Sequence, residues 1–140
     1  MSITYVPIAL RRLVYEHAGE RCEYCLLPEI TVFAAHEIDH IIAEKHGGLT
    51  AFDNLALSCT LCNQHKGSDL TSIDPDTDQI VTLYNPRRNR WTDHFQLRGA
   101  EIFPLTPTGR ATVRLLQFND PERVEERAWL ISFGLFLPPD

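Results

Sequence analysis

The sequence predicts an α+β fold in which a cysteine-containing first half precedes a second half of short strands and two helices. Three observations lead to this prediction. Two Cys-x-x-Cys pairs lie in the first half, short alternating apolar segments recur along the chain, and apolar residues at helical spacing occur toward both ends. The 140 residues suit one domain with an extension packed on it. We expect a first domain at 1–72 and a strand-rich, then helical extension at 73–140.

In the first half, a helix is predicted over about residues 7–18. Pro7 suits the start of a helix, apolar residues recur at helical spacing from Ile8 to Val14, and Gly19 suits its end. The elements expected next are a tight turn at 21–27, a strand at 31–42, a turn at Gly47 and Gly48, a short strand or helical turn at 55–58, and a helix that starts near Asn63.

The second half reads as strands followed by helices. Strands are expected at 79–84, 91–97 and 101–105, with a turn at 85–89. Thr106 followed by Pro107 predicts a helix start, and the segment from Asn119 to Glu122 is a second capping signature. The last helix should run to about Phe133.

Composition excludes several classes of protein. Apolar residues make up 44% of the chain, which is too many for a disordered protein, and no apolar run approaches the roughly 18 residues of a membrane span. The N-terminal segment lacks the pattern of a secretory signal, so we expect a cytoplasmic location and no membrane partner. The net charge of −6 weighs mildly against nucleic-acid binding, but its uneven distribution leaves room for a local basic face.

All four cysteines fall into the two pairs, Cys22 with Cys25 and Cys59 with Cys62. A Cys-x-x-Cys turn directs two thiolates at one point, and two such turns complete the tetrahedral sulfur site that Zn²⁺ prefers. Because four protein ligands leave no open position, this zinc would be structural. Buried free cysteines or a redox pair are the alternatives, although two matched pairs favour a metal.

Polar side chains suited to phosphodiester hydrolysis lie between and just after these pairs. His40 could act as a general base, since an ordinary histidine pKa of about 6.5 fits neutral operation. Asp39 and Asn63 offer the oxygen ligands that Mg²⁺ and Mn²⁺ prefer. Lys66 shares a helix face with Asn63 and could contact a phosphate. Each of these residues alone is more often structural. Their joint order between and just after the two cysteine pairs is what favours a hydrolytic site.

The full pattern resembles the HNH endonucleases that carry a four-cysteine zinc site. It reads Cys22-x-x-Cys25, Asp39-His40-Ile41-Ile42, Gly47-Gly48, Asn54-Leu55, Cys59-x-x-Cys62 and Asn63-x-x-Lys66. The resemblance covers roughly the first half of the chain. The second half is similar to an extension that accompanies HNH domains in small bacterial proteins, notably cyanobacterial ones.

The resemblance implies a ββα-metal (His-Me finger) core, in which two strands and a helix hold one catalytic divalent ion, Mg²⁺ or Mn²⁺. His40 would be the general base, Asp39 and Asn63 the ion's ligands, and Asn54 the residue that braces the loop and orients His40. The remaining candidates are Lys66 in the catalytic set, His36 and Glu37 at the rim, and His65 as an alternative ligand. Strict strand alternation places Asp39 and His40 on opposite faces, so the strand must bend or end there.

An arginine-rich segment gives the second half a possible role. Arg87, Arg88 and Arg90 suit phosphate contact, and Trp91 beside them suits base stacking. The structural alternative is a charged turn with Trp91 in the core.

The resemblance implies a metal-dependent endonuclease acting on DNA. The alternatives are the same chemistry on RNA, or a non-catalytic zinc module that binds nucleic acid or a protein.

Overall fold

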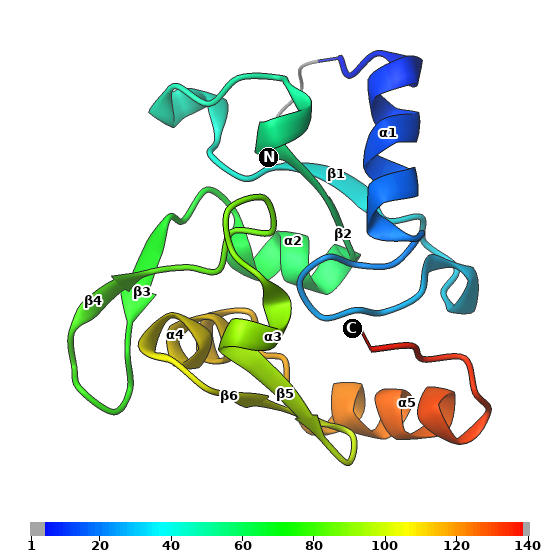
Figure 1. Cartoon of the computed structure of the whole chain (residues 1–140), viewed down its shortest axis with the longest axis vertical. Helices are drawn as coiled ribbons and strands as arrows, with labels where there is room; N and C mark the ends of the chain where they lie inside the picture. Colours follow the sequence, from blue (N-terminus) through cyan, green and yellow to red (C-terminus); the bar gives the residue numbers. More distant parts are fainter. Residues whose placement is uncertain (1–4, 139–140) are drawn as a thin grey trace. The chain divides into compact units, whose positions relative to one another are not determined.

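The structure is a computed structural model that describes residues 5–138. The chain divides into two compact units, Met1–Ser68 and Asp69–Asp140 (Figure 1). Helices and small antiparallel sheets occur in both units, which confirms the α+β fold class. No helix in the described part of the chain is long and apolar enough to cross a membrane.

Unit 1 is built on a two-stranded antiparallel sheet with a helix on either side. Its helices and strands are α1 (Ile8–Ala18), β1 (Glu37–His40), β2 (Leu55–Ser58) and α2 (Thr60–Lys66), with short 3-10 turns at Glu29–Thr31, Glu44–His46 and Phe52–Asn54. In the sheet, Glu37 lies opposite Ser58 and His40 lies opposite Leu55. The order β1, β2, α2 is the expected ββα arrangement.

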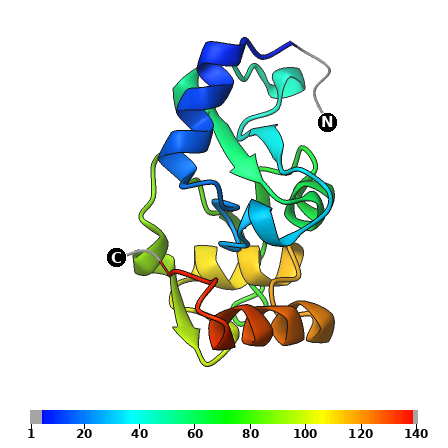
Figure 2. The same ribbon diagram turned by 90° about the vertical axis from the view of Figure 1, so that its right-hand side faces the viewer.

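The core of unit 1 lies between α1 and β2. Val14 and Ala18 of α1 pack with Leu55 and Leu57 of β2, and every residue of β2 is buried. Figure 2 shows the sheet between α1 and α2, and α2 contacts β1. The helix predicted over 7–18 is confirmed, and Gly19 ends it in the left-handed conformation (φ 64°) that glycine adopts without strain.

Two expectations for unit 1 need correction. The strand expected at 31–42 is confined to Glu37–His40, because the Glu29 carboxylate accepts from the backbone N–H of His36 and folds the preceding segment into a turn. The apolar side chains of that segment, among them Ile30 and Phe33, are exposed instead of alternating into a core. The helix expected near Asn63 starts at Thr60, because the Cys59 Sγ accepts from the N–H of Cys62 and caps it.

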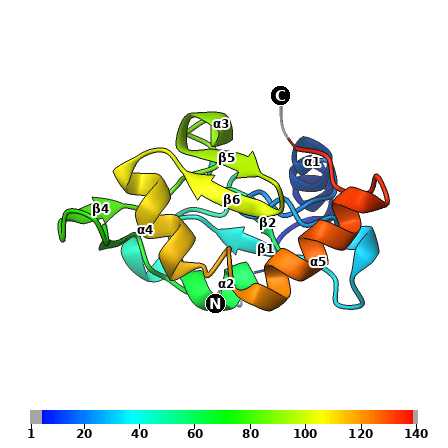
Figure 3. The same ribbon diagram turned by 90° about the horizontal axis from the view of Figure 1, so that it is seen from below.

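The described residues of unit 2 form two antiparallel hairpins and three helices. Its elements are β3 (Thr71–Ile73), β4 (Ile80–Thr82), α3 (Trp91–His94), β5 (Phe95–Arg98), β6 (Glu101–Pro104), α4 (Pro107–Leu115) and α5 (Pro121–Ser132). Figure 3 shows α4 and α5 beside the β5–β6 hairpin. The side chain of Thr106 caps α4 by accepting from the N–H of Gly109, as its sequence predicts. Pro121 begins α5, which ends at Ser132, close to the expected Phe133.

Two buried arginines hold α5 against the rest of unit 2. Arg123 donates to the carbonyl of Leu116 at the end of α4 (2.6 Å), and Arg127 donates to the carbonyls of Phe118 (2.9 Å) and Ala100 (2.7 Å). These bonds satisfy carbonyl groups that the end of a helix and a turn leave without backbone partners.

The strand expected at 91–97 is wrong in its first half. Residues Trp91–His94 form a helical turn, and the strand begins at Phe95. Trp91 and Phe95 are four residues apart, and their rings pack at 5.1 Å in the core with Phe118. The spacing of Trp91 and Phe95 therefore reflects a helical turn. In so short a segment, a spacing of four residues fits both a helix and an alternating strand.

Candidate functional site

The four cysteines form a compact, buried cluster in unit 1. Their Sγ atoms all lie within 4.8 Å of one another, and the Sγ atoms of Cys25 and Cys59 are 3.6 Å apart. Tetrahedral Zn–S bonds of about 2.3 Å would place sulfur atoms roughly 3.8 Å apart. The cysteines are therefore positioned to form a metal site, and their spacing fits a tetrahedral ion.

Without an ion, burial keeps the thiols of this cluster neutral. Burial raises the pKa of the Cys22 and Cys62 thiols well above the ordinary value, because a charged thiolate is poorly solvated there. A bound divalent ion reverses this preference and deprotonates its thiol ligands. The N–H groups of Cys25 and Cys62 point at the sulfurs of Cys22 (3.4 Å) and Cys59 (3.5 Å), which favours the thiolate form further.

Asp39 lies on β1 in a buried polar network. Its Oδ2 atom accepts a hydrogen bond from the Tyr24 hydroxyl (3.0 Å) and lies 3.3 Å from the Lys66 ammonium. Burial raises the pKa of the Asp39 carboxyl, and the positive charge of Lys66 opposes this shift. The other oxygen, Oδ1, accepts no hydrogen bond from any residue in 5–138. One oxygen of Asp39 is thus held by the protein, and the other has no hydrogen-bond partner among these residues.

Asn63 faces the same side of β1 as Asp39. Glu37 and Asp39 are two residues apart on the strand, and Asn63 and Lys66 are three apart on α2, so each pair shares a face. The Asn63 Nδ2 donates to Glu37 Oε2 (2.7 Å), while its Oδ1 accepts no hydrogen bond within the described residues. The structure therefore brings Glu37, Asp39 and Asn63 to one side of the strand pair.

His40 occupies the last position of β1, where the strand ends. Its Nε2 lies 2.8 Å from the Thr50 hydroxyl, and its buried Nδ1 has no hydrogen-bond partner in the described chain. A buried polar atom without a partner is rare, and the Nδ1 of His36 is a second one in the described chain, so this property alone does not single out His40. Asp39 and His40 contact different elements, as strand alternation requires, but both lie at the point where β1 gives way to a loop.

Asn54 ties this loop to the strand. Its side chain accepts from the N–H of Ile42 and donates to the carbonyls of Ile42 and Leu49, each at 2.9 Å. Gly48 packs against the same point, since a Cβ atom there would lie 1.7 Å from the Ile42 carbonyl oxygen. The bracing contacts expected of Asn54 are present, whereas its effect on His40 stays a prediction.

The other predicted site residues differ in their surroundings. Lys66 is only 3% exposed and donates to the Ile41 carbonyl (3.0 Å). These contacts favour a structural role inside unit 1 over the predicted contact with a phosphate. The Nε2 of buried His36 lies 2.8 Å from the Leu27 carbonyl, which makes His36 an anchor of the turn before β1. His65 is half-buried on α2. The catalytic and ligand roles assigned to these residues stay predictions.

The arginine-rich segment lies in unit 2. Asn85 Oδ1 accepts from the N–H groups of Arg87 and Arg88, which fixes the expected turn, and the side chains of Arg88 and Arg90 are exposed. Trp91 is buried, which confirms the alternative in which it lies in the core and excludes base stacking by it in this structure. Phosphate contact by the arginines does not depend on Trp91.

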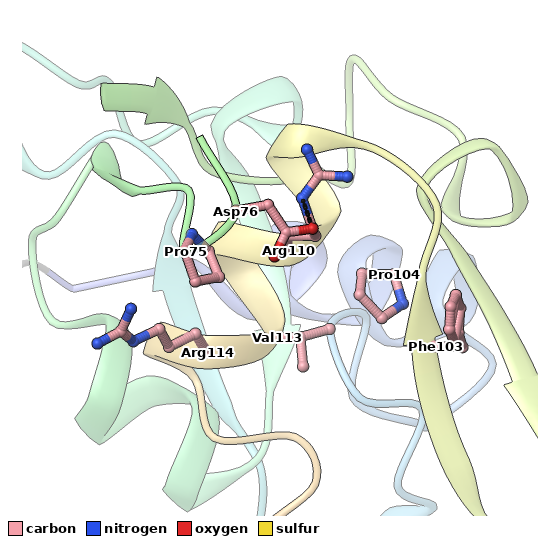
Figure 4. Close-up of a pocket in the computed structure, with 7 residues that line it drawn as sticks. All are labelled: Pro75, Asp76, Phe103, Pro104, Arg110, Val113 and Arg114. Carbon is pink, nitrogen blue, oxygen red and sulfur yellow. Dashed lines mark ion pairs between the residues drawn. The ribbon is translucent and has the colours of Figure 1, made fainter. Parts of the chain in front are cut away.

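Unit 2 also contains a pocket of about 510 Å³ (Figure 4). Its walls are formed by Pro75, Asp76, Phe103, Pro104, Arg110, Val113 and Arg114. The Arg110 guanidinium pairs with Asp74 (2.8 Å) and Asp76 (3.1 Å). Because these acids balance its charge, the pocket does not present Arg110 as an anion site. None of the predicted site residues lines it.

Sequence reasoning missed two residues that contact the predicted set. Thr50 holds His40, and Tyr24 holds Asp39. Tyr24 lies inside the first Cys-x-x-Cys, but no local pattern indicates its contact with Asp39. Thr50 lies in a loop and left no signal in the sequence.

Comparison with known proteins agrees with this geometry. The family model for the HNH endonuclease matches residues 22–69, from the first cysteine to just beyond α2. The resemblance drawn from the motifs is thus confirmed over this segment, about a third of the chain. No curated protein and no solved structure matches. Since HNH proteins are generally nucleases that act on nucleic acids, the match indicates a nuclease-type function for unit 1.

Proposed function

We propose that the protein is a metal-dependent endonuclease that hydrolyses phosphodiester bonds in DNA. One observation carries this proposal. The two predicted ion ligands, Asp39 and Asn63, each have one side-chain atom fixed by the protein and an oxygen, Oδ1, without a hydrogen bond among residues 5–138. Hard oxygen atoms of this kind are the ligands that Mg²⁺ and Mn²⁺ prefer. The donor set therefore fits a catalytic divalent ion.

Asp39 and Asn63 would hold this ion, with Glu37 beside them. When bound, the ion would supply positive charge that neutralises the phosphate and stabilises the leaving oxygen. The protein's share is to hold both ligands in place. Asp39 is fixed by Tyr24 and Lys66, and Asn63 is fixed by Glu37.

His40 would act as the general base. If its Nε2–H donates to Thr50, the lone pair of Nδ1 is free to accept a proton from water. That water then attacks phosphorus as the bond to the 3′ oxygen breaks. The leaving oxygen takes up a proton from solvent, which leaves 5′-phosphate and 3′-hydroxyl ends. Asn54 supports His40 indirectly by closing the loop that carries Thr50.

The cysteine cluster would hold a structural Zn²⁺, because all four positions of a tetrahedral ion are then occupied by sulfur. Reduced, metal-bound cysteines suit a reducing compartment such as the cytoplasm.

Arg87, Arg88 and Arg90 would contact the phosphate backbone, and binding should then weaken as salt increases. We assign residues 1–72 to the nuclease domain and 73–140 to its extension.

Plasmid cleavage tests the proposal. Supercoiled plasmid is incubated with zinc-loaded protein and Mg²⁺ or Mn²⁺, with EDTA as the metal control. His40→Ala should lose several orders of magnitude in rate while keeping its zinc. His46→Ala is the matched control, because His46 is exposed on a 3-10 turn of the same unit. An unchanged rate in His40→Ala would remove the general-base role.

Substrate comparison separates the remaining possibilities. Parallel reactions with single-stranded DNA and RNA show which polymer is cleaved. A zinc-loaded protein that binds these polymers, cleaves none of them and takes up no second divalent ion would be a binding module instead. Metal analysis should find one tightly held zinc and a weaker ion that EDTA removes first.

A further inference from the structure

Tyr24 links the cysteine cluster to the candidate ion ligand. It lies between Cys22 and Cys25 in the sequence, and its side chain is 1% exposed. Its hydroxyl donates to Asp39 Oδ2 at 3.0 Å. A residue inside the first metal-binding turn thus reaches the strand that carries Asp39.

The residue before Tyr24 fixes the same turn to the sheet. The N–H of Glu23 donates to the Leu57 carbonyl, and the Glu23 carboxylate accepts from the Leu57 N–H, both at 2.8 Å. Leu57 lies opposite Ile38, the residue next to Asp39. The first Cys-x-x-Cys turn is therefore attached to β2 at the level of Asp39, and the Tyr24 hydroxyl reaches Asp39 from a fixed base.

We propose that Tyr24 is a positioning residue for the catalytic divalent ion. By holding Oδ2, it sets the orientation of the Asp39 carboxylate so that Oδ1 is presented to the ion, and it couples the zinc-binding turn to the ion site. This inference rests on the proposed function. Hydrogen bonds from protein donors to metal-ligating carboxylates are a general means of fixing ligand geometry.

Lys66 does not make Tyr24 redundant. Both groups approach the same oxygen of Asp39, but the Lys66 ammonium carries a positive charge that repels a nearby cation. The Tyr24 hydroxyl is neutral, so it orients the carboxylate without this repulsion. Loss of the hydroxyl should therefore weaken ion binding while leaving the Lys66 contact in place.

Removing the hydroxyl should weaken Mn²⁺ binding by about 10- to 100-fold, the usual cost of losing a hydrogen bond to a metal ligand. Tyr24→Phe removes this oxygen and keeps the ring. Tyr15→Phe is the matched control, because the Tyr15 hydroxyl also bonds a carboxylate of unit 1, Glu29 (2.7 Å), but does not touch Asp39. Mn²⁺ affinity is measured by electron paramagnetic resonance of the free ion, using protein with its zinc content verified.

Cleavage kinetics provide a second measurement. The Mn²⁺ concentration for half-maximal cleavage should rise in Tyr24→Phe by the same factor, whereas the rate at saturating Mn²⁺ should change little. A lower saturating rate with unchanged Mn²⁺ affinity would overturn the inference, as would equal Mn²⁺ affinity in Tyr24→Phe and wild type. An effect of the same size in Tyr15→Phe would also overturn it, by showing a general loss of packing.

An isosteric pair keeps the test decisive if Tyr24→Phe loses zinc. Tyr24→para-aminophenylalanine keeps a donor at the same place, and Tyr24→para-methylphenylalanine fills the space without one. Only the first should bind Mn²⁺ nearly as wild type does, and equal affinities would refute the positioning role. If wild-type protein binds no Mn²⁺ and cleaves nothing, the proposed function has failed first. If wild-type protein binds Mn²⁺ and cleaves its substrate, but the two Tyr24 variants have equal Mn²⁺ affinities, only the role of Tyr24 has failed.

Discussion

The side chain of Asn54 forms a two-way hydrogen bond with the backbone of Ile42, accepting from its N–H and donating to its carbonyl, both at 2.9 Å. Asn54 directly precedes β2 and Ile42 lies just beyond β1, so this pair closes the connection between the strands. A third bond, to the Leu49 carbonyl, holds the middle of the connection. Thr50, whose hydroxyl contacts His40, lies in this connection, and we expect its position to depend on the closure.

Asn54→Asp should open the loop. The carboxylate can still accept from the Ile42 N–H, but it cannot donate to two carbonyl groups and instead repels them. We expect a loss of about 2 kcal/mol or more in the free energy of unfolding, measured by urea denaturation with zinc bound, and a lower cleavage rate. Asp53→Asn is the matched control, since the neighbouring Asp53 is exposed. Equal stability of Asn54→Asp and wild type would show that the closure is not needed.

The elements that local patterns specify were predicted well. The two Cys-x-x-Cys pairs predict that four thiols meet at one point, and the structure places all four together, in position to form a metal site. The helix of residues 7–18 and the starts of α4 and α5 followed from Pro7, Gly19 and the cap residues. Asn54 was expected to brace a loop, and its contacts do so.

What the sequence could not supply were the contacts between distant segments. The bond from Tyr24 to Asp39 spans 15 residues and the clasp from Lys66 to Ile41 spans 25, and no local pattern encodes either. The strand expected at 91–97 is wrong for a similar reason. The packing of Trp91 with Phe95 and Phe118 depends on a helical turn that the alternating sequence concealed. Tertiary contacts there override local preference.

Lys66→Met should destabilise unit 1. The Lys66 ammonium is buried, lies 3.3 Å from Asp39 Oδ2 and donates to the carbonyl of Ile41. Methionine fills a similar volume but leaves the buried carboxylate without its cation, a change that costs about 3 kcal/mol. Urea denaturation of the zinc-loaded protein measures this loss. Lys45→Met, at an exposed site, should have little effect. Comparable losses of unfolding free energy in the two variants would mean that the contacts of Lys66 with Asp39 and Ile41 do not stabilise unit 1.

The stability of the protein should depend on Asp74 in acid. Two hydrogen bonds from Arg110 hold the pKa of the Asp74 carboxyl far below its ordinary value of about 3.9. Since the unfolded chain takes up this proton first, the stabilisation is complete above about pH 4 and declines as the pH falls further toward the folded-state pKa.

Asp74→Asn measures this contribution. The difference in unfolding free energy between wild type and variant should be constant above about pH 4 and shrink below it. Taking a difference removes the effect of acid on the cysteine cluster, which both proteins share. A difference that grows as the pH falls would have the wrong sign and would exclude the Asp74–Arg110 pair as its source.

Thr50→Val should slow cleavage without unfolding the protein. Valine has nearly the shape of threonine but cannot hydrogen-bond the His40 Nε2, so the imidazole loses a contact that holds its orientation. A misplaced general base costs about 10- to 100-fold in rate. We expect this loss at saturating Mn²⁺, with zinc content and melting temperature close to those of wild type.

Thr31→Val provides the control for this change. The Thr31 hydroxyl also makes a hydrogen bond in unit 1, to the Pro28 carbonyl (2.8 Å), but it touches none of the candidate site residues. Thr31→Val should therefore cleave at the wild-type rate. If Thr50→Val also cleaves at that rate, His40 does not need Thr50 to act. If Thr50→Val instead loses Mn²⁺ affinity and keeps its saturating rate, the contact serves the ion site and the base must be oriented by another group.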